Sequence, residues 1–137
     1  MTIQEKKDYL SQYIQASRKI DSLIYEKISV EDLVYKVSPT LSDVPKGGAG
    51  QDKIQCGVEK MIELGQKIAA EVEDLIRQRE KVSDAIRTVE DVKQREVLRL
   101  RYINGFTWEK IAVEMNLTYQ WVCALHGRAL QKINFPN

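Results

Sequence analysis

The sequence predicts an all-α protein, in which a long antiparallel helical hairpin is followed by three short helices. Two long stretches carry apolar residues at helical spacing, and a segment rich in proline and glycine separates them. The last third of the chain is divided into three shorter periodic segments by residues that favour helix ends. No stretch alternates apolar and polar residues in the manner of a β-strand. These observations together favour a purely helical fold.

The first long helix is predicted from Ile3 to Val37, where apolar side chains recur mostly at spacings of three, four and seven residues. Ser38-Pro39 is expected to end it, because the residue before a proline avoids the helical region. Residues 38–51 are therefore predicted to be a loop. A phosphate-binding glycine loop is excluded here, since the pattern GxxxxGK[ST] is missing and no strand precedes it.

The second long helix is predicted from Asp52 to Val89, with apolar residues at roughly heptad spacing. They are Val58, Ile62, Ile68, Val72, Leu75, Ile76, Val82, Ile86 and Val89. A long amphipathic helix must bury its apolar row, so the two helices are expected to pack against each other in residues 1–90. Two helices make little core, and a homo-oligomer, most simply a dimer, would cover the rest. Packing against the C-terminal helices is the alternative.

The three short helices are predicted from their end signals. Asp91 can cap a helix from Val92 to Ile103, which Asn104-Gly105 would end. Thr107 is expected to cap the next helix, Trp108 to Met115.

The last helix is expected to begin after Thr118 as its cap and to run to about Ile133. Asn116 falls between the second and third short helices, where a sharp turn needs a positive φ that asparagine tolerates.

This spacing is typical of a helix-turn-helix, whose last helix enters the major groove of DNA. A small residue is needed where its two helices cross, and Ala112 stands at that position. The core positions are then all apolar, namely Ile111, Met115, Leu117, Val122 and Leu125. Residues 91–137 are therefore predicted to be a DNA-binding domain.

Four residues at the start of the last helix are predicted to face DNA, together with Gly127: Thr118, Tyr119, Gln120 and Cys123. Gln120 could contact adenine N6 and N7 with both ends of its amide. Tyr119 could contact a phosphate or a thymine methyl group, and Thr118 could donate to a phosphate. Four cationic side chains are candidate phosphate contacts: Arg99, Lys110, Arg128 and Lys132.

The charge distribution agrees with a phosphate-facing C-terminal region. The whole chain has a net charge of +1, but residues 92–137 hold seven basic and three acidic side chains, a balance of +4. Residues 52–91 hold seven basic and ten acidic side chains, a balance of −3. Cations that neutralise phosphates supply sequence-independent affinity for nucleic acid.

Residues 95–133 resemble the fourth conserved region of bacterial sigma factors, which reads the promoter −35 element. The resemblance lies in the REVLRLRY opening, in Gly105-Phe106-Thr107, in Ile111-Ala112 and in the Arg128 to Ile133 ending. It implies double-stranded DNA as a partner and raises RNA polymerase as a second.

The whole chain is also similar to a family of small proteins of Gram-positive phages and prophages, related to the ArpU-like and RinA-like late regulators. Sigma factors carry charged residues on the outer face of the last helix, whereas this chain has Tyr119, Gln120, Trp121 and Cys123. We therefore expect a phage transcriptional regulator that reads a different DNA sequence. A packaging component resembling a small terminase subunit and a module that docks on polymerase or sigma are the alternatives.

Several classes of function are disfavoured by what the sequence lacks. No catalytic arrangement and no cofactor site appears, and His126 has no partners at metal-ligand spacing. Cys56 and Cys123 are expected to be free and buried. No apolar run is long enough to cross a membrane and no signal peptide is visible, so we expect a protein of the bacterial host cytoplasm without membrane contact.

Overall fold

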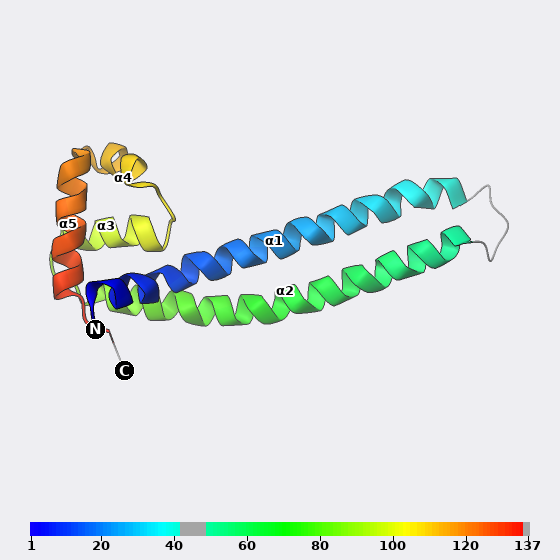
Figure 1. Cartoon of the computed structure of the whole chain (residues 1–137), viewed down its shortest axis with the longest axis horizontal. Helices are drawn as coiled ribbons and strands as arrows, with labels where there is room; N and C mark the ends of the chain where they lie inside the picture. The colour runs from blue at the N-terminus through cyan, green and yellow to red at the C-terminus, as the bar shows by residue number, and fades with distance from the viewer. Residues whose placement is uncertain (42–48, 136–137) are drawn as a thin grey trace. The chain divides into compact units, whose positions relative to one another are not determined.

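A computed structural model describes residues 1–41 and 49–135 of the chain. These residues form five α-helices, shown in Figure 1: α1 (Ile3–Leu41), α2 (Ala49–Arg87), α3 (Val92–Tyr102), α4 (Trp108–Met115) and α5 (Tyr119–Lys132). The first two form a long hairpin, and three short helices follow it. The predicted fold class is therefore confirmed.

The ends of the long helices differ from the prediction. Helix α1 continues through Ser38-Pro39 to Leu41, so the expected stop at Ser38 is wrong. Proline disfavours a helical residue before it but removes only one hydrogen-bond donor when it lies in a last turn. Helix α2 begins at Ala49 and ends at Arg87, so both helices extend into the predicted loop. The rest of that loop, residues 42–48, lies outside the described residues.

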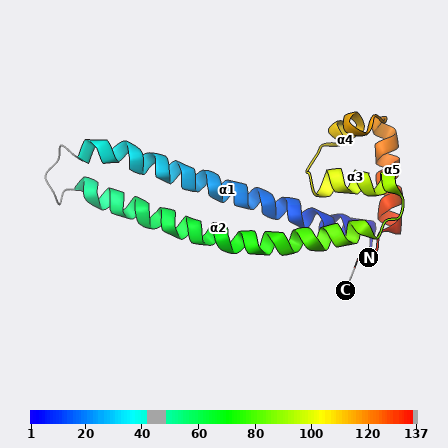
Figure 2. The ribbon, with the colours of Figure 1, turned by 180° about the vertical axis from the view of Figure 1, so that it is seen from behind.

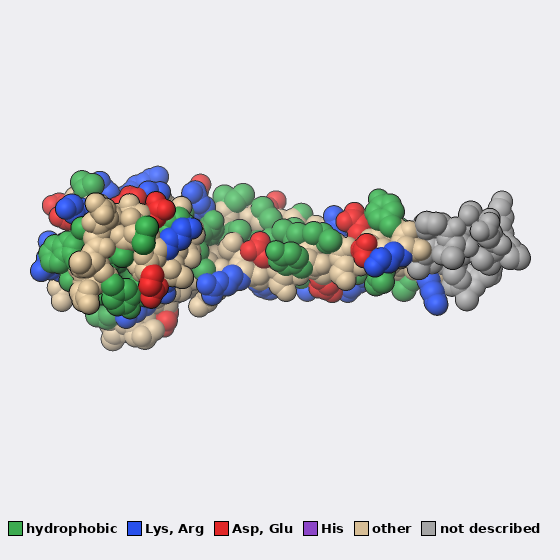
Figure 3. Space-filling view, turned by 90° about the horizontal axis from the view of Figure 1, so that it is seen from above, with side chains coloured by type: hydrophobic (Ala, Val, Ile, Leu, Met, Phe, Trp, Pro, Cys, Tyr) green, Lys and Arg blue, Asp and Glu red, His purple; other side chains and the backbone are tan. Residues whose placement is uncertain are grey.

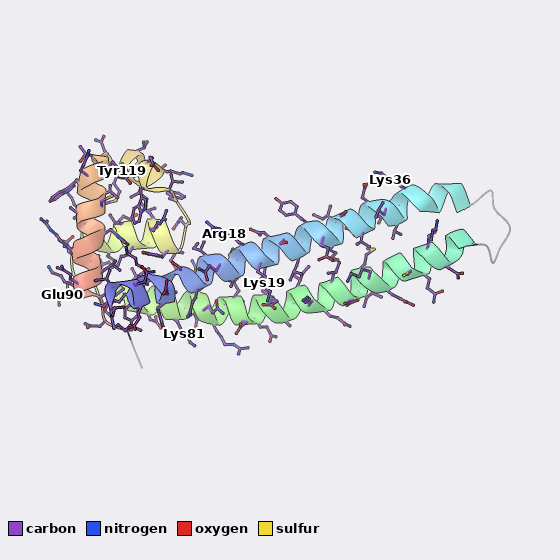
Figure 4. The ribbon with its side chains drawn as sticks, in the orientation of Figure 1. Arg18, Lys19, Lys36, Lys81, Glu90 and Tyr119 are labelled. Atoms are coloured by element: carbon purple, nitrogen blue, oxygen red, sulfur yellow. The ribbon has the colours of Figure 1, made fainter. Side chains whose placement is uncertain are left out.

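The chain divides into two compact units, each built from more than one segment. Residues Arg18–Asp74 form one unit, in which α1 and α2 pair over parts of their lengths. Among residues 18–36 and 52–74, three apolar side chains are buried: Ile20, Leu23 and Leu64. The ammonium of Lys19, labelled in Figure 4, lies 3.1 Å from the carboxylate of Glu71 on α2.

At Gly57 the two helices of this unit approach each other closely. Its Cα faces the side chain of Val34 so closely that a Cβ would overlap the Val34 methyl group. Glycine lets the backbones approach where any larger residue would force them apart. The contact also sets the pairing of the two helices in this part of the hairpin.

The other unit contains Met1–Ser17 and Leu75–Asn137, so the ends of the long helices share a core with the short ones. Leu10 of α1 is completely buried there, beside Val82 and Ile86 of α2. The same cluster includes side chains from α3, α5 and the residue after α5: Leu98, Tyr102, Ala129, Leu130 and Ile133. Within this unit the long helices therefore pack against the C-terminal helices, the arrangement that the sequence left as an alternative.

Polar contacts hold the N-terminal residues and the residues after α5 in this unit. The ammonium of Lys6 donates to the carbonyl of Leu130 at 2.7 Å. The backbone N–H of Asn134 donates to the hydroxyl of Thr88 at 2.9 Å, and this hydroxyl donates to the Ala85 carbonyl at 2.6 Å. Through these bonds Thr88 ends α2 and links it to the chain after α5.

In Figures 1 and 2, α3 and α4 both lie against α5. Among the described helices, none is both long enough and apolar enough to span a lipid bilayer.

Candidate DNA-binding site

The three short helices begin at capping residues whose side chains accept backbone N–H groups. Asp91 accepts from Gln94 N at 2.9 Å at the start of α3, and Thr107 accepts from Lys110 N at 3.2 Å at the start of α4. Thr118 accepts from Trp121 N at 3.1 Å at the start of α5. Each bond satisfies one of the donors that a helix leaves unpaired at its N-terminus. The three predicted caps are therefore confirmed.

The turn between α4 and α5 depends on Asn116, which adopts the left-handed conformation with φ 56° and ψ 46°. It is the one residue other than glycine with a positive φ in the described part of the chain. The N–H of Leu117 closes the turn by donating to the Ala112 carbonyl at 2.9 Å. The predicted position and conformation of this turn are confirmed, and they fix the direction in which α5 leaves α4.

A second core cluster holds α3, α4 and α5 together. Ile111 and Val122 are completely buried, and Ala112 lies with them where α4 meets α5. The remaining buried members are Val97, Leu100 and Leu125, with Phe106, Trp108, Met115 and Leu117 partly buried at the edge. Every core position predicted from the sequence is in this cluster. Packing on this apolar side fixes which residues of α5 face outward.

A buried polar pair links α3 to the middle of α5. Tyr102 Oη lies 2.8 Å from His126 Nε2, and the edge of the Trp108 ring packs on the imidazole with centroids 4.6 Å apart. Burial, with smaller contributions from Lys7 and Arg101, lowers the pKa of His126 to about 4. Burial raises the pKa of Tyr102 to about 12. Near neutral pH both side chains are therefore uncharged, and the pair is part of the scaffold.

The predicted reading residues lie on exposed surface at the start of α5. Tyr119, Gln120 and Cys123 are exposed in the first turn and a half, and Thr118 is exposed before them. Gln120, Cys123 and Gly127 follow one another at helical spacing on the side opposite the buried Val122 and Ala129. A Cβ at Gly127 would meet no atom within 4 Å, so a partner can approach the backbone there.

The N-terminus of α5 adds a feature suited to a phosphate. Its first N–H groups point away from the helix, and its dipole is positive at this end. The Tyr119 side chain, labelled in Figure 4, lies beside Cys123. The nearby Cys123 raises the pKa of the Tyr119 hydroxyl, chiefly by charge interaction and then by a hydrogen bond. The phenol thus keeps its proton and remains a donor.

A second exposed row on α5 contains Arg128, a predicted phosphate contact, and Trp121, which the sequence did not place in the site. Trp121 is 40% exposed, and the guanidinium of Arg128 lies 5.0 Å from the centroid of its ring. This contact positions a cation next to the predicted reading residues. The seven-residue spacing between Trp121 and Arg128 on one helix could have predicted this contact from the sequence.

The other cationic candidates lie at three different places. Lys110 of α4 has its ammonium 4.0 Å from the Phe106 ring centroid. Lys132 is exposed in the last turn of α5, about 20 Å along the helix from Thr118 at 1.5 Å per residue.

Arg99 is bound by both carboxylate oxygens of Glu96 and lines a groove with Ser83, Ile86 and Arg87 of α2. No residue of α4 or α5 lines that groove, so Arg99 does not join the others.

Both cysteines are free and exposed, so the expectation that they are buried is wrong. Each lies at an outward position of its helix, and the mere presence of two cysteines in the sequence does not reveal that position. Within residues 1–41 and 49–135, no three side chains of His, Cys, Asp or Glu are grouped to hold a metal ion.

The geometry defines a helix-turn-helix: two helices crossing at a small residue, a left-handed turn, and a last helix whose outer row is exposed. Residues 91–134 match the family model for sigma-70, region 4. The C-terminal part of the chain is therefore a domain of the sigma-70 region 4 type, a class of DNA-binding module. No curated protein and no solved structure matched the chain significantly.

Proposed function

We propose that this protein is a sequence-specific regulator of transcription, encoded by a phage or prophage and acting in the cytoplasm of a Gram-positive host. In this proposal residues 91–137 serve as the DNA-binding domain, and residues 1–90 carry the hairpin. The observation that supports it most strongly is the exposed row of Gln120, Cys123 and Gly127 on α5. The left-handed turn at Asn116 holds this exposed row at a fixed angle to α4, as recognition of DNA by a last helix requires.

The roles follow from the chemistry of each side chain. Gln120 pairs with adenine in the major groove, because its amide matches the acceptor N7 and the donor N6. Cys123 and Tyr119 lie together on one side of Gln120 and contact neighbouring bases or a thymine methyl group. Thr118 and the N-terminus of α5 hold a phosphate.

Three of the four predicted cations bind the DNA backbone in this proposal: Lys110, Arg128 and Lys132. Binding should weaken with salt at a log–log slope of about −0.9 per phosphate contacted, thus about −2.7 for the three. Arg99 lies apart from them, beside Glu96, and its removal should leave the slope unchanged.

The test is a fluorescence anisotropy titration with a duplex selected by the full chain from a random pool. Arg128→Ala should reduce the salt slope by about 1 and weaken binding to all duplexes alike. Arg18→Ala, which removes an exposed arginine from α1 (labelled in Figure 4), is the matched control and should leave the slope unchanged. A wild-type slope near zero, or no binding at low salt, would refute the proposal.

The likeness to sigma region 4 supports a second partner, RNA polymerase. A pull-down of polymerase by the wild-type chain and by Gln120→Ala separates the two contacts. Retention of polymerase by both, with DNA binding reduced only in the variant, supports a regulator that uses α5 for DNA and another surface for polymerase.

A further inference from the structure

The unit formed by Arg18–Asp74 exposes an apolar face that its own two helices do not cover. Along α2 a continuous row of apolar or small residues recurs at alternating spacings of four and three: Val58, Ile62, Gly65, Ala69 and Val72. The large members remain in contact with solvent, Ile62 at 56% and Val58 at 40% exposed. This is the spacing of a helix that packs along a second helix.

The row on α2 is separate from the residues that α2 uses against α1. The buried Leu64 and the partly buried Ile68 and Gly57 define the side that faces α1. At about 100° per residue the exposed row lies roughly a quarter-turn of the helix away. It is thus a second packing surface on a helix that already has one.

Helix α1 extends the same face. Ile24, Ile28 and Tyr35 share one side of α1 and are 38%, 53% and 69% exposed. They lie about a quarter-turn beyond the side with Leu23, in the same rotational sense as the row on α2. In an antiparallel pair this brings both rows to one side of the hairpin.

The pairing of Val34 with Gly57 and of Lys19 with Glu71 then sets Ile28 level with Ile62. Glu31 interrupts the row on α1, so α2 forms the centre of the face.

We propose that this face is the interface of a homodimer and that its occupant is the same face of a second copy of the chain. Its area suits a weak, reversible dimer. The row from Val58 to Val72 is about 21 Å long, so two helices about 10 Å wide present about 420 Å² on each side, or about 840 Å² in total, which is the size of a weak interface. Figure 3, which looks onto the α1 edge of the hairpin, shows hydrophobic side chains between charged ones along its length.

The order of residues on α2 favours a second copy over an unrelated partner. Gly65 and Ala69 stand at the middle of the row, and larger side chains stand on both sides of them. A twofold axis between these two residues places Gly65 against the second copy's Ala69, and Ile62 against the second copy's Val72. A surface that is complementary to itself in this way closes with one partner and leaves no free half.

Glycine and alanine at the crossing also allow the helices to approach closely. A Cβ at Gly65 would meet only the end of the Lys27 side chain, 4.0 Å away, so no contact within the hairpin requires glycine there. A close helix from outside gives a reason for the small residue. The proposal rests on the dimer predicted from the sequence and not on DNA binding, so either can fail alone.

The test is sedimentation equilibrium of the full chain without DNA. The wild type should be a dimer, and Ile62→Glu should raise its Kd at least about 100-fold, because an unpaired carboxylate would be buried. Leu33→Glu is the matched control: Leu33 is 60% exposed but lies on the opposite side of α1 from Ile24, Ile28 and Tyr35, so its Kd should change less than about threefold.

Far-UV circular dichroism of both variants checks that the helices remain. A second charged variant, Val72→Glu, should dissociate the dimer as Ile62→Glu does. A monomeric wild type, a ring of eight or more copies, or equal weakening by Leu33→Glu would each overturn the proposal.

Discussion

Acid should destabilise the unit that contains the helix-turn-helix, because His126 is buried in its uncharged form. The folded pKa of about 4 lies below the ordinary value of 6.5, so the unfolded chain binds a proton more readily. The stabilising contribution is complete above about pH 6.5. It decreases as the pH falls from there to about 4, and below that value the folded protein is protonated as well.

The magnitude follows from the two pKa values. Their difference of about 2.5, at about 1.36 kcal/mol for each pKa unit, corresponds to about 3 kcal/mol. This is a large fraction of the 5–15 kcal/mol, roughly, that stabilises an ordinary domain. Protonation would place a charge beside the Tyr102 hydroxyl and the Trp108 ring, with the cations Lys7 and Arg101 nearby.

The assay is urea unfolding of the wild type and of His126→Leu at a series of pH values from about 7.5 to 4.5, in the range where the histidine acts. The difference in unfolding free energy between the two proteins isolates the histidine. The variant leaves the Tyr102 hydroxyl without its partner, but that cost is the same at every pH and does not affect the slope. The reasoning fails if the two proteins lose stability in parallel as the pH falls.

Two further predictions concern the backbone. In an Ile62→Glu background that removes self-association, Gly65→Ala should stabilise α2 by up to about 1 kcal/mol through helix propensity. Gly57→Ala should destabilise the hairpin by about 1–2 kcal/mol net, because the new Cβ overlaps Val34. Equal thermal unfolding midpoints for Gly57→Ala and Gly65→Ala would contradict this. Asn116→Ala should cost about 1 kcal/mol in urea unfolding, since alanine is strained at φ 56°, whereas Asn116→Gly should be nearly neutral. Equal stability of the alanine and glycine variants would argue against strain at this turn.

The short helices could be predicted from the sequence because their ends are set by local chemistry. Each short helix is capped by a side chain that accepts the N–H three residues later, from Asp91, Thr107 or Thr118. The turn before α5 needs only the left-handed conformation of one residue, Asn116. The core of α4 and α5 follows from helical spacing alone. Such features depend on neighbours within a few residues.

Other features depend on contacts between distant segments, which a single sequence does not reveal. Leu10 fills a core with Leu98 and Leu130, and Lys6 binds the Leu130 carbonyl, although about ninety or more residues separate each pair. For the same reason the place of Arg99, in a groove with α2, could not be foreseen. The continuation of α1 past Pro39 shows that a local stop signal is a bias which the rest of a helix can outweigh.

The most direct test of the central claim is the base preference of Gln120→Ala. Binding of the wild type and the variant is measured on the selected duplex and on duplexes with one base pair changed at a time. The wild type should discriminate by about 1–3 kcal/mol at an A·T pair that the variant no longer distinguishes, with the other positions unaffected. Gln12→Ala, an exposed glutamine on α1, is the control and should keep the full preference. If Gln120→Ala retains the wild-type preference at every position, the row on α5 does not read DNA.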